Sequence, residues 1–252
     1  GTDPALKAFE ERADIAQLVT LLTSDWDRKM KRDSAGALAF HAFAHLVTSG
    51  VIEDDLQPIL YEVVLQSAPM YMLKIGSLAL RGEYSNGDAV MQEGRSLVVM
   101  NALAQTAAFL TERFGTVDPS AYRYSDMRVS AMEYAYGRPM QPDVGNGGVE
   151  VPTDGGESTV NVAQSLFRDD GSIAERWRSH WGPIERQVMS FDDDGVPVSH
   201  ANFALGNVAD PSSPHFKGAL GDWVEGRYRK MLFARDEIDE AAFERHSLPP
   251  AP

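Results

Sequence analysis

Apolar residues recur at helical spacing throughout the first half of the chain. Ile15, Leu18 and Leu22 are three or four residues apart, which is the spacing of a helix that buries one face. Pro4 fits the first turn of this helix, because a proline there removes no hydrogen bond. The same spacing returns further along. Four more helices are predicted, over residues 34–49, 54–80, 88–114 and 124–136.

Prolines, glycines and small polar residues indicate where these helices begin and end. Asp33 or Ser34 is expected to cap the second helix, and Gly50 is expected to end it. Pro69 is expected to kink or break the third helix, because it lacks a backbone N–H. Gly115 is expected to end the fourth. Residues 1–140 are therefore predicted to form a mainly helical segment.

The pattern changes near residue 140. Residues 141–156 are rich in glycine, proline and aspartate, which is typical of a linker. Beyond it, apolar and polar residues alternate in short runs with the period of a strand. The sequence Asp192-Asp-Asp-Gly195 separates two of these runs and predicts a hairpin. Three strands are predicted, over residues 158–162, 184–191 and 198–205.

Helical patterns return at the end of the chain. One helix is predicted over residues 218–233 and another over 236–245, before the Pro-rich tail 248–252. Residues 157–233 thus hold the antiparallel strands and a helix, and residues 234–252 a short helix and the tail. The predicted fold class is α+β, with a large helical block, a few antiparallel strands and a terminal helix pair. Because three strands alone make a poor sheet, we expect them to complete a sheet whose other strands lie elsewhere.

Composition and charge exclude several classes of protein. The chain has 252 residues, 43% hydrophobic and 24% charged, as in an ordinary globular protein. A formal net charge of −14 argues against nucleic acid as a partner. We expect no membrane partner, because charges are expected to interrupt every apolar stretch before the ~18–20 residues of a spanning helix. The absence of cysteine excludes disulfides, thiolate nucleophiles and sulfur ligands to a metal.

His41 and His45 are the candidates for metal binding. They are four residues apart on a predicted helix, so both imidazoles can lie on one face. Ala42 follows the first histidine, where zinc proteases of this pattern carry a catalytic glutamate. The sequence indicates no third ligand. A polar edge on a packed helix is therefore the favoured interpretation, and we expect no metal and no cofactor.

No other motif predicts a self-contained active site. The glycines at 145–148 are not followed by the Lys and Ser or Thr of a phosphate-binding loop. The carboxylates at 192–194 have no second cluster to complete a calcium loop. The chain also has no Gly-x-Ser-x-Gly elbow for a serine nucleophile. We therefore expect no catalytic residue in this chain, and the sequence identifies no substrate-binding residue.

The end of the chain carries a run of glycine, proline and aromatic residues. It reads Gly206-Asn-Val-Ala-Asp-Pro-Ser-Ser-Pro-His-Phe216, and Trp223-Val-Glu-Gly-Arg-Tyr228 follows. This sequence resembles the C-terminal signature of the penicillin acylase (penicillin amidase) family, a Gly-Gln-Ser-Gly-x-Pro-x-Ser-Pro-His-Tyr turn and then Trp-x-x-Gly-x-Tyr. The signature residues that we expect to be structural are Gly206, Asn207, Ser213, Pro214, His215 and Trp223.

Upstream segments extend the resemblance to nearly the whole chain. Gly155-Gly-Glu-Ser-Thr-Val-Asn161 resembles the family's Gly-Gly-Asp-x-x-Thr-Val-Asn, and Gly182-Pro-Ile-Glu-Arg186 resembles its Gly-x-Ser-x-Arg strand. Near the start, Leu22-Thr-Ser-Asp-Trp26-Asp27 resembles Leu-x-x-Trp-Asp-Gly. Asp33-Ser-Ala-Gly-Ala37 resembles Asp-Ser-x-x-Ala. The order and spacing of these segments match those of the family.

This resemblance implies an N-terminal-nucleophile hydrolase with an αββα sandwich. In such an enzyme a precursor cuts itself, and the new N-terminal Ser of the β chain attacks an amide with its own amine as base. Our chain resembles the C-terminal half of that β chain, so the nucleophile and oxyanion residues are expected upstream and the isolated chain is expected to be inactive. The implied partners are upstream segments of the same precursor (the α chain and the N-terminal part of the β chain) and a small acylated amine. The resemblance also implies a role in antibiotic metabolism and a periplasmic or secreted location.

Two residues depart from the family pattern. Ser190 stands where the cephalosporin and quorum-quenching branches often carry a glutamate that supports the active-site histidine. Asn207 stands where the signature has glutamine. These departures leave open a family member with altered or lost activity. The other alternative is a non-catalytic helical domain that binds a protein or an apolar ligand.

Overall fold

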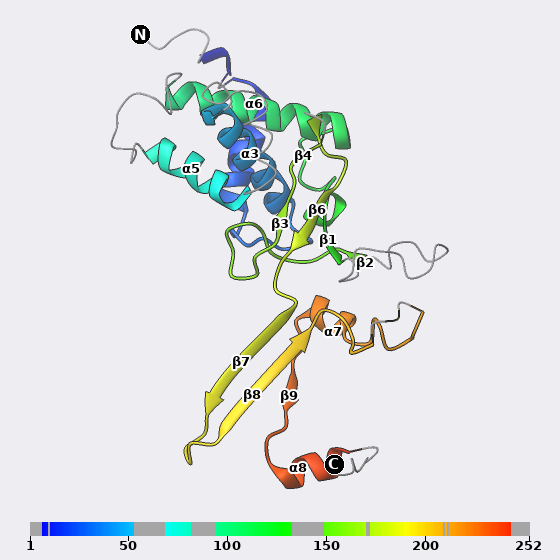
Figure 1. The fold of residues 1–252 in the computed structure, drawn as a ribbon. Coiled ribbons are helices and arrows are strands. Elements are labelled where there is room, and N and C mark those ends of the chain that lie inside the picture. Colours follow the sequence, from blue (N-terminus) through cyan, green and yellow to red (C-terminus); the bar gives the residue numbers. More distant parts are fainter. Residues whose placement is uncertain are drawn as a thin grey trace. The chain divides into compact units, whose positions relative to one another are not determined.

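The structure is a computed structural model that describes residues 7–9, 11–52, 69–81, 94–132, 149–169, 172–208, 210 and 212–242. The chain divides into two compact units, Gly1–Gly182 and Pro183–Pro252. The first unit contains the long helices and a mixed sheet. The second contains a three-stranded antiparallel sheet and two short helices (Figure 1).

Three long helices form the body of the first unit. Helix α3 (Ala35–Ile52) packs against both α5 (Pro69–Arg81) and α6 (Arg95–Phe114). Helix α2 (Ala13–Thr20) contacts α6 and continues into a π-helical turn, η1 (Leu21–Asp25). A helix that is apolar on nearly all sides is stable only in the interior of a protein, and α3 is such a helix.

Helix α3 corrects one expectation from the sequence. It contains no Asp, Glu, Lys or Arg, and it is long and apolar enough to cross a membrane. The prediction that charges interrupt every apolar stretch was therefore wrong here. The physical reason is its position in the core, since 72% of this stretch is buried inside the protein.

Two helix ends that depend on adjacent residues lie where the sequence predicts them. The Ser34 hydroxyl accepts a hydrogen bond from the Ala37 N–H at 3.1 Å, so the predicted cap of α3 is confirmed. Gly115 ends α6 with a φ of 78°, a conformation that favours glycine. Helix α5 begins at Pro69, where the third predicted helix was expected to break. Its predicted first part, over residues 54–68, lies outside the described residues.

Two predicted helix ends were wrong. Gly50 lies inside α3, and a Cβ there would approach Val98 of α6 to 3.5 Å, so this glycine lies at a helix–helix contact. Helix α6 begins at Arg95, because Gly94 has a φ of 81° and cannot continue a helix. Residues 88–93 of the predicted helix lie outside the described residues.

A four-stranded sheet of the first unit was not predicted. Strand β1 (Arg128–Met132) is antiparallel to β2 (Val149–Val151) and parallel to β6 (Trp177–Trp181), which pairs with β3 (Gln164–Ser165). The antiparallel-only expectation was therefore wrong. The parallel pair joins segments almost 50 residues apart in the chain, and such a pairing leaves little local signal. Two short strands, β4 (Arg168–Asp169) and β5 (Ser172–Ile173), form a separate hairpin.

Three sequence predictions fall within this region. The helix predicted over residues 124–136 is a 3₁₀ turn (Tyr124–Asp126) followed by β1. The linker predicted over residues 141–156 contains β2. The strand predicted over residues 158–162 is a series of turns, held by hydrogen bonds from Thr159 and Asn161. Residues 133–148 lie outside the described residues.

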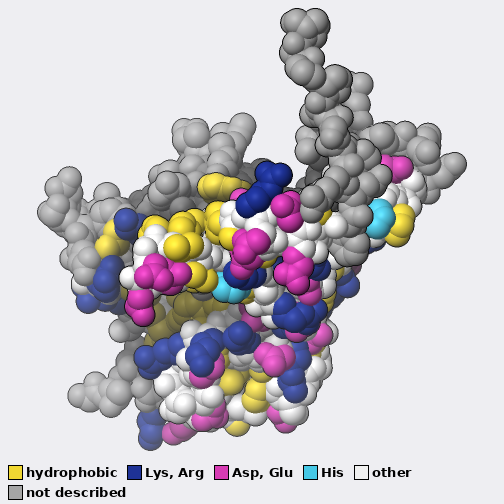
Figure 2. Space-filling model, turned by 90° about the horizontal axis from the view of Figure 1, so that it is seen from below, with side chains coloured by type: hydrophobic (Ala, Val, Ile, Leu, Met, Phe, Trp, Pro, Cys, Tyr) yellow, Lys and Arg dark blue, Asp and Glu magenta, His cyan; other side chains and the backbone are white. Residues whose placement is uncertain are grey.

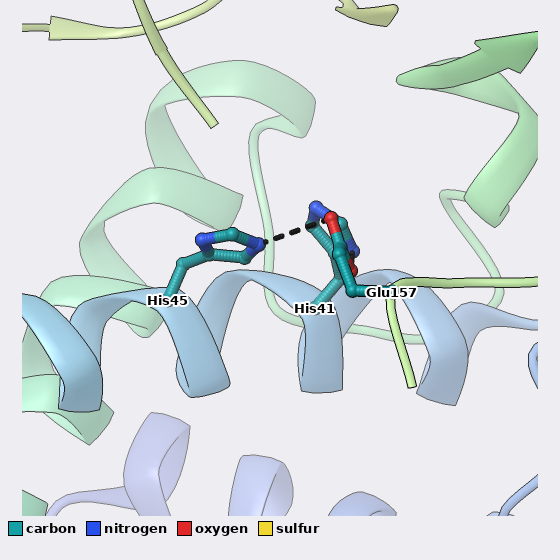
Figure 3. Close-up of side chains that lie close together, drawn as sticks. All are labelled: His41, His45 and Glu157. Atoms are coloured by element: carbon teal, nitrogen blue, oxygen red, sulfur yellow. Dashed lines mark hydrogen bonds and ion pairs between the residues drawn. The ribbon is translucent and has the colours of Figure 1, made fainter. Parts of the chain in front are cut away.

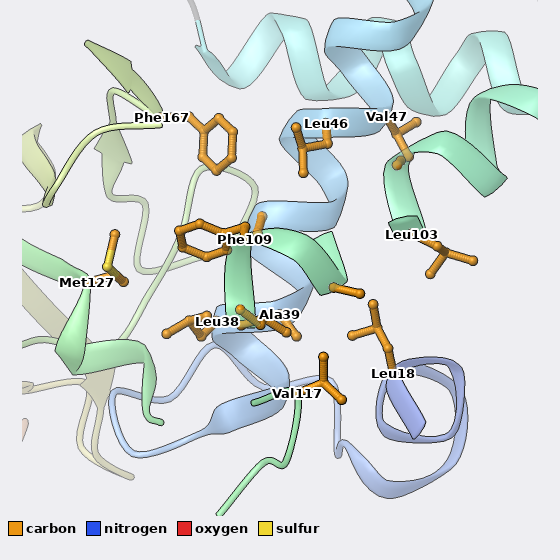
Figure 4. Packing of buried hydrophobic residues seen from close by; sticks show 14 of the residues in the cluster. Leu18, Leu38, Ala39, Leu46, Val47, Leu103, Phe109, Val117, Met127 and Phe167 are labelled. Carbon is orange, nitrogen blue, oxygen red and sulfur yellow. The ribbon is translucent and has the colours of Figure 1, made fainter. Parts of the chain in front are cut away.

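The core of the first unit lies between α3, α6 and the segments that follow. Leu38, Leu46 and Val47 of α3 lie near Leu103 and Phe109 of α6 (Figure 4). The side chains that are fully buried also include aromatic residues beyond the helices. These are Tyr122, Tyr124 and Trp177. The sheet and the helices therefore share one hydrophobic core.

The second unit is built on a hairpin that the sequence predicted correctly. Strands β7 (Glu185–Phe191) and β8 (Pro197–Phe203) pair along their whole length, and Asp192 stabilises the turn by accepting the N–H groups of Asp194 and Val196. The helix predicted over residues 218–233 is only α7 (Leu220–Glu225), which ends at Gly226 with a φ of 66°.

A third strand follows α7. Strand β9 (Arg229–Met231) pairs with β8, where the sequence predicted the continuation of a helix. The last predicted helix is present as α8 (Arg235–Ala241). The terminal helix pair is therefore interrupted by a strand. Residues 243–252, including the predicted Pro-rich tail, lie outside the described residues.

Candidate functional site

Two histidines and a glutamate meet in the interior of the first unit. His41 and His45 lie one turn apart on α3, and Glu157 comes from the segment between β2 and β3 (Figure 3). The His41 Nδ1 atom is 3.5 Å from Glu157 Oε2, and the His45 Nε2 atom is 3.3 Å from Glu157 Oε1. The three side chains together are called the His–His–Glu cluster below.

The His–His–Glu cluster is almost completely shielded from solvent. His41, His45 and Glu157 are 2%, 4% and 3% exposed. The His41 ring stacks on Trp177 with centroids 4.4 Å apart, and the His45 ring stacks on Phe167 at 4.7 Å. These aromatic contacts hold each imidazole in a fixed orientation, with one ring nitrogen toward the carboxylate.

Glu157 accepts further hydrogen bonds from Ser165 of β3. Both the N–H and the hydroxyl of Ser165 donate to Glu157 Oε1, at 3.4 and 3.2 Å. The Tyr124 hydroxyl lies 3.1 Å from His41 Nδ1. Ser165 therefore bonds to the carboxylate and not to a histidine, so this group is not arranged as a serine–histidine nucleophile pair.

The chain before Glu157 is fixed by a glycine and an aspartate. Gly155 has a φ of 107°, and a Cβ there would overlap the carbonyl oxygen of Asn161. The Asp154 carboxylate accepts hydrogen bonds from Lys31 Nζ at 2.7 Å and from the Arg32 N–H at 2.8 Å. These contacts tie the segment to the chain before α3 and direct Glu157 inward.

Burial and mutual attraction set the protonation of the cluster. Burial lowers the pKa of His41 to about 3, because the effect of dehydration exceeds the attraction of Glu157. Burial alone would raise the pKa of Glu157, but the two histidines outweigh it and lower the pKa to about 2. At neutral pH the cluster therefore contains an ionised carboxylate beside a neutral His41 imidazole.

Helical spacing identified the two histidines of the cluster but not its glutamate. The prediction that His41 and His45 have no third candidate ligand was wrong, because Glu157 places a carboxylate against both rings. Glu157 is 112 residues from His45 along the chain, so helical spacing could not reveal it. Its signal was the Gly155-Gly156-Glu157 segment, which was assigned only to the family resemblance.

A large cavity borders the cluster. Its volume is about 1280 Å³, and it lies within the first unit. Trp26, Phe40 and Val47 contribute to its apolar lining, and His41 and Glu157 also line it. The cluster is therefore shielded from bulk solvent, and two of its members, His41 and Glu157, form part of the cavity wall.

The signature residues lie in the second unit, five of them around the turn before α7 and Trp223 within α7. The Gly206 N–H donates to the Phe216 carbonyl at 2.8 Å, and a Cβ at Gly206 would overlap the carbonyl oxygen of His215. The Ser213 hydroxyl accepts a hydrogen bond from the His215 N–H at 3.2 Å. Asn207, Pro214 and the His215 side chain are exposed.

Trp223 connects α7 to the start of β7. Its indole N–H donates to the Pro183 carbonyl at 3.0 Å, and the Arg186 guanidinium lies 4.3 Å from the ring centroid. Arg186 also donates to the Trp223 carbonyl at 2.7 Å. The segment that resembles Gly-x-Ser-x-Arg and the C-terminal signature are therefore in direct contact.

Comparisons with known proteins agree with this reading of the motifs. The family model for penicillin amidase matches residues 4–240. The chain belongs to the penicillin amidase family. The fold is similar to that of a thermostable penicillin G acylase from Alcaligenes faecalis, with a TM-score of 0.57 and 14% sequence identity. The match covers 98% of this chain but only 45% of the acylase chain. No curated protein matches the sequence.

Replacing Glu157 by glutamine tests the cluster. The substitution keeps the shape but removes the charge that faces two histidines, so we expect it to lower the free energy of unfolding by about 1–3 kcal/mol. The control is Glu150→Gln, because Glu150 pairs with Arg178 at the surface and such pairs contribute about 0–1 kcal/mol. Urea unfolding measures both variants. Equal effects of the two substitutions would contradict a special role for the buried carboxylate.

Replacing Gly206 by alanine tests the signature turn. The added methyl group would meet the His215 carbonyl, so the turn must open, and we expect faster cleavage of the second unit in limited proteolysis. Gly221→Ala is the matched control, because a Cβ at Gly221 in α7 has room, with Arg227 Nη2 at 3.9 Å. A Gly206→Ala variant as resistant as the control would show that the turn tolerates a side chain.

Proposed function

We propose that this chain is the C-terminal part of an amidohydrolase that cleaves the linear amide between an acyl group and an amine. The observation that supports this most is the match to the penicillin amidase family over residues 4–240. The nucleophile is an N-terminal Ser released by self-cleavage of a precursor, and it lies upstream of this chain. The chain spans 45% of the length of the penicillin G acylase that it matches, which leaves room for such a segment.

The surface of the second unit supports a larger assembly. Val188, Met189 and Phe191 of β7 are 60%, 52% and 67% exposed. Adjacent residues of a strand point to opposite faces, so Val188 and Met189 expose apolar groups on both sides of the sheet. We infer that upstream segments cover these faces and extend the sheet into the αββα sandwich of the N-terminal-nucleophile hydrolases. Those segments are the partners in this proposal, together with a small acylated amine as substrate.

The proposed reaction needs little from this chain. The upstream Ser hydroxyl attacks the amide carbonyl, its own amine takes the proton, and backbone and side-chain donors stabilise the oxyanion. This chain provides the structural frame, and alone it is inactive. We place the protein in the periplasm or outside the cell, with a role in antibiotic metabolism, on the basis of the family.

Charge also bears on the choice of partner. The formal net charge is −14, and acidic and basic side chains are interspersed on the face shown in Figure 2. A nucleic-acid partner would require a continuous cationic surface. The net charge and this face therefore argue against a nucleic-acid partner.

A family member with altered activity is the second candidate. Ser190 lies on β7, where the acylase branches often carry a glutamate that supports the active-site histidine. A serine cannot supply a carboxylate at this position. We infer that the acyl preference differs from that of those branches, or that turnover is slower.

Reconstitution tests the proposed function. The chain is produced alone, and also as part of the longer precursor with the segment encoded before it. Hydrolysis of chromogenic anilides with acyl groups of increasing length is then measured. We expect no hydrolysis by the chain alone and hydrolysis by the matured precursor. The control replaces the new N-terminal Ser of the matured β chain by alanine.

Two outcomes would contradict the proposal. One is a folded and self-cleaved precursor that hydrolyses none of the anilides. The other is hydrolysis by the chain alone at the rate of the precursor, because the nucleophile would then lie within these 252 residues.

A further inference from the structure

We propose that the His–His–Glu cluster binds a divalent transition-metal ion, with Zn²⁺ as the first choice. The ligands are one ring nitrogen of each histidine and a carboxylate oxygen of Glu157, and one such atom from each residue lies within 4.8 Å of the others. His41 Nδ1 and His45 Nε2 are the nitrogens that face the carboxylate. Neither the proposed amide hydrolysis nor the signature residues require this site, so the inference stands independently of the proposed function.

Two of the distances within the cluster are close to those between the ligands of a tetrahedral site. Bonds of about 2.0–2.1 Å from Zn²⁺ to nitrogen and oxygen place neighbouring ligand atoms about 3.3–3.4 Å apart. The carboxylate oxygens of Glu157 are 3.5 Å from His41 Nδ1 and 3.3 Å from His45 Nε2. Two of the three ligand pairs therefore already have nearly the spacing of zinc ligands, each through a different carboxylate oxygen. Since one ligand atom from each of the three residues lies within 4.8 Å of the others, rotation about the terminal bonds can bring all three onto one ion.

The donor types select the class of metal. Two imidazole nitrogens and one carboxylate are the ligand set that Zn²⁺ and its neighbours Co²⁺ and Ni²⁺ prefer. Ca²⁺ and Mg²⁺ need six or more oxygen ligands and would not be satisfied here. Metal ligation requires neutral histidine and ionised carboxylate, so zinc binding at this site should weaken as the pH falls and the ligands compete for protons.

The surroundings of the cluster leave a fourth coordination position open to the cavity. They also place a positive charge nearby, which limits the affinity for a metal ion. His41 and Glu157 line the 1280 Å³ cavity, so a bound ion would face a space that can hold water or a ligand. The Tyr124 hydroxyl, 3.1 Å from His41 Nδ1, and the Ser165 hydroxyl, 3.2 Å from Glu157 Oε1, also lie beside the cluster. The charge of the buried Arg128, which lowers the pKa of His41, opposes a cation, and the Glu157 carboxylate offsets that charge.

Equilibrium zinc binding tests the proposal on the 252-residue chain without an affinity tag. The chain is stripped with a chelator, and Zn²⁺ is titrated in competition with a chromogenic chelator. We expect one equivalent of zinc per chain, and at least ~10-fold weaker binding in His45→Gln and Glu157→Gln. The control is His200→Gln, because His200 is exposed on β8 and belongs to the other unit. Mg²⁺ should neither bind at the site nor compete with zinc.

The outcomes separate clearly. No zinc binding by the unaltered chain overturns the proposal, and so does binding that the two cluster variants retain or that His200→Gln loses equally. If a cluster variant fails to fold, the visible absorption of Co²⁺ bound to the unaltered chain tests the proposed site instead. Strong absorption typical of four-coordinate Co²⁺ with nitrogen and oxygen ligands supports the site, and weak six-coordinate absorption overturns it.

Discussion

The burial of one carboxylate beside two imidazoles is the interaction on which the first unit depends. An ionised Glu157 away from water is costly unless its oxygens are paired, and His41, His45 and Ser165 supply that pairing. The carboxylate comes from the turn-rich segment before β3, whereas the histidines come from α3. The cluster therefore attaches the sheet region to the core helix by polar contacts within an apolar interior.

Neighbouring contacts make this arrangement specific. Arg128 of β1 donates to Thr153, whose hydroxyl lies 2.7 Å from that of Ser130, so the chain entering the Glu157 segment is held by buried polar groups. Asp154 then binds Lys31 and the backbone before α3. These hydrogen bonds fix the chain just before Gly155 and so limit the positions that Glu157 can take against α3. The same segment, from Gly156 to Val162, also forms one wall of the apolar cavity.

Features that depend on a few adjacent residues could be predicted from the sequence. Features that depend on contacts between distant segments could not. The Ser34 cap, the Gly115 stop and the turn at Asp192 each depend on a few adjacent residues, and all three appear as expected. The parallel pairing of β1 with β6 and the approach of Glu157 to α3 depend on tertiary contacts. The sequence therefore identified two of the three cluster residues by spacing, and the third only as part of a family motif.

Ring-nitrogen NMR of His41 in the metal-free chain tests the account most directly. If the cluster is dry and Glu157 is ionised within it, the His41 ring stays neutral from about pH 7.5 down to about pH 5, because its pKa is lowered to about 3. The ring ¹⁵N shifts should then remain constant over this interval. A His41 ring that gains its proton with a midpoint near the ordinary value of 6.5 would contradict the account, since solvent would then reach the cluster.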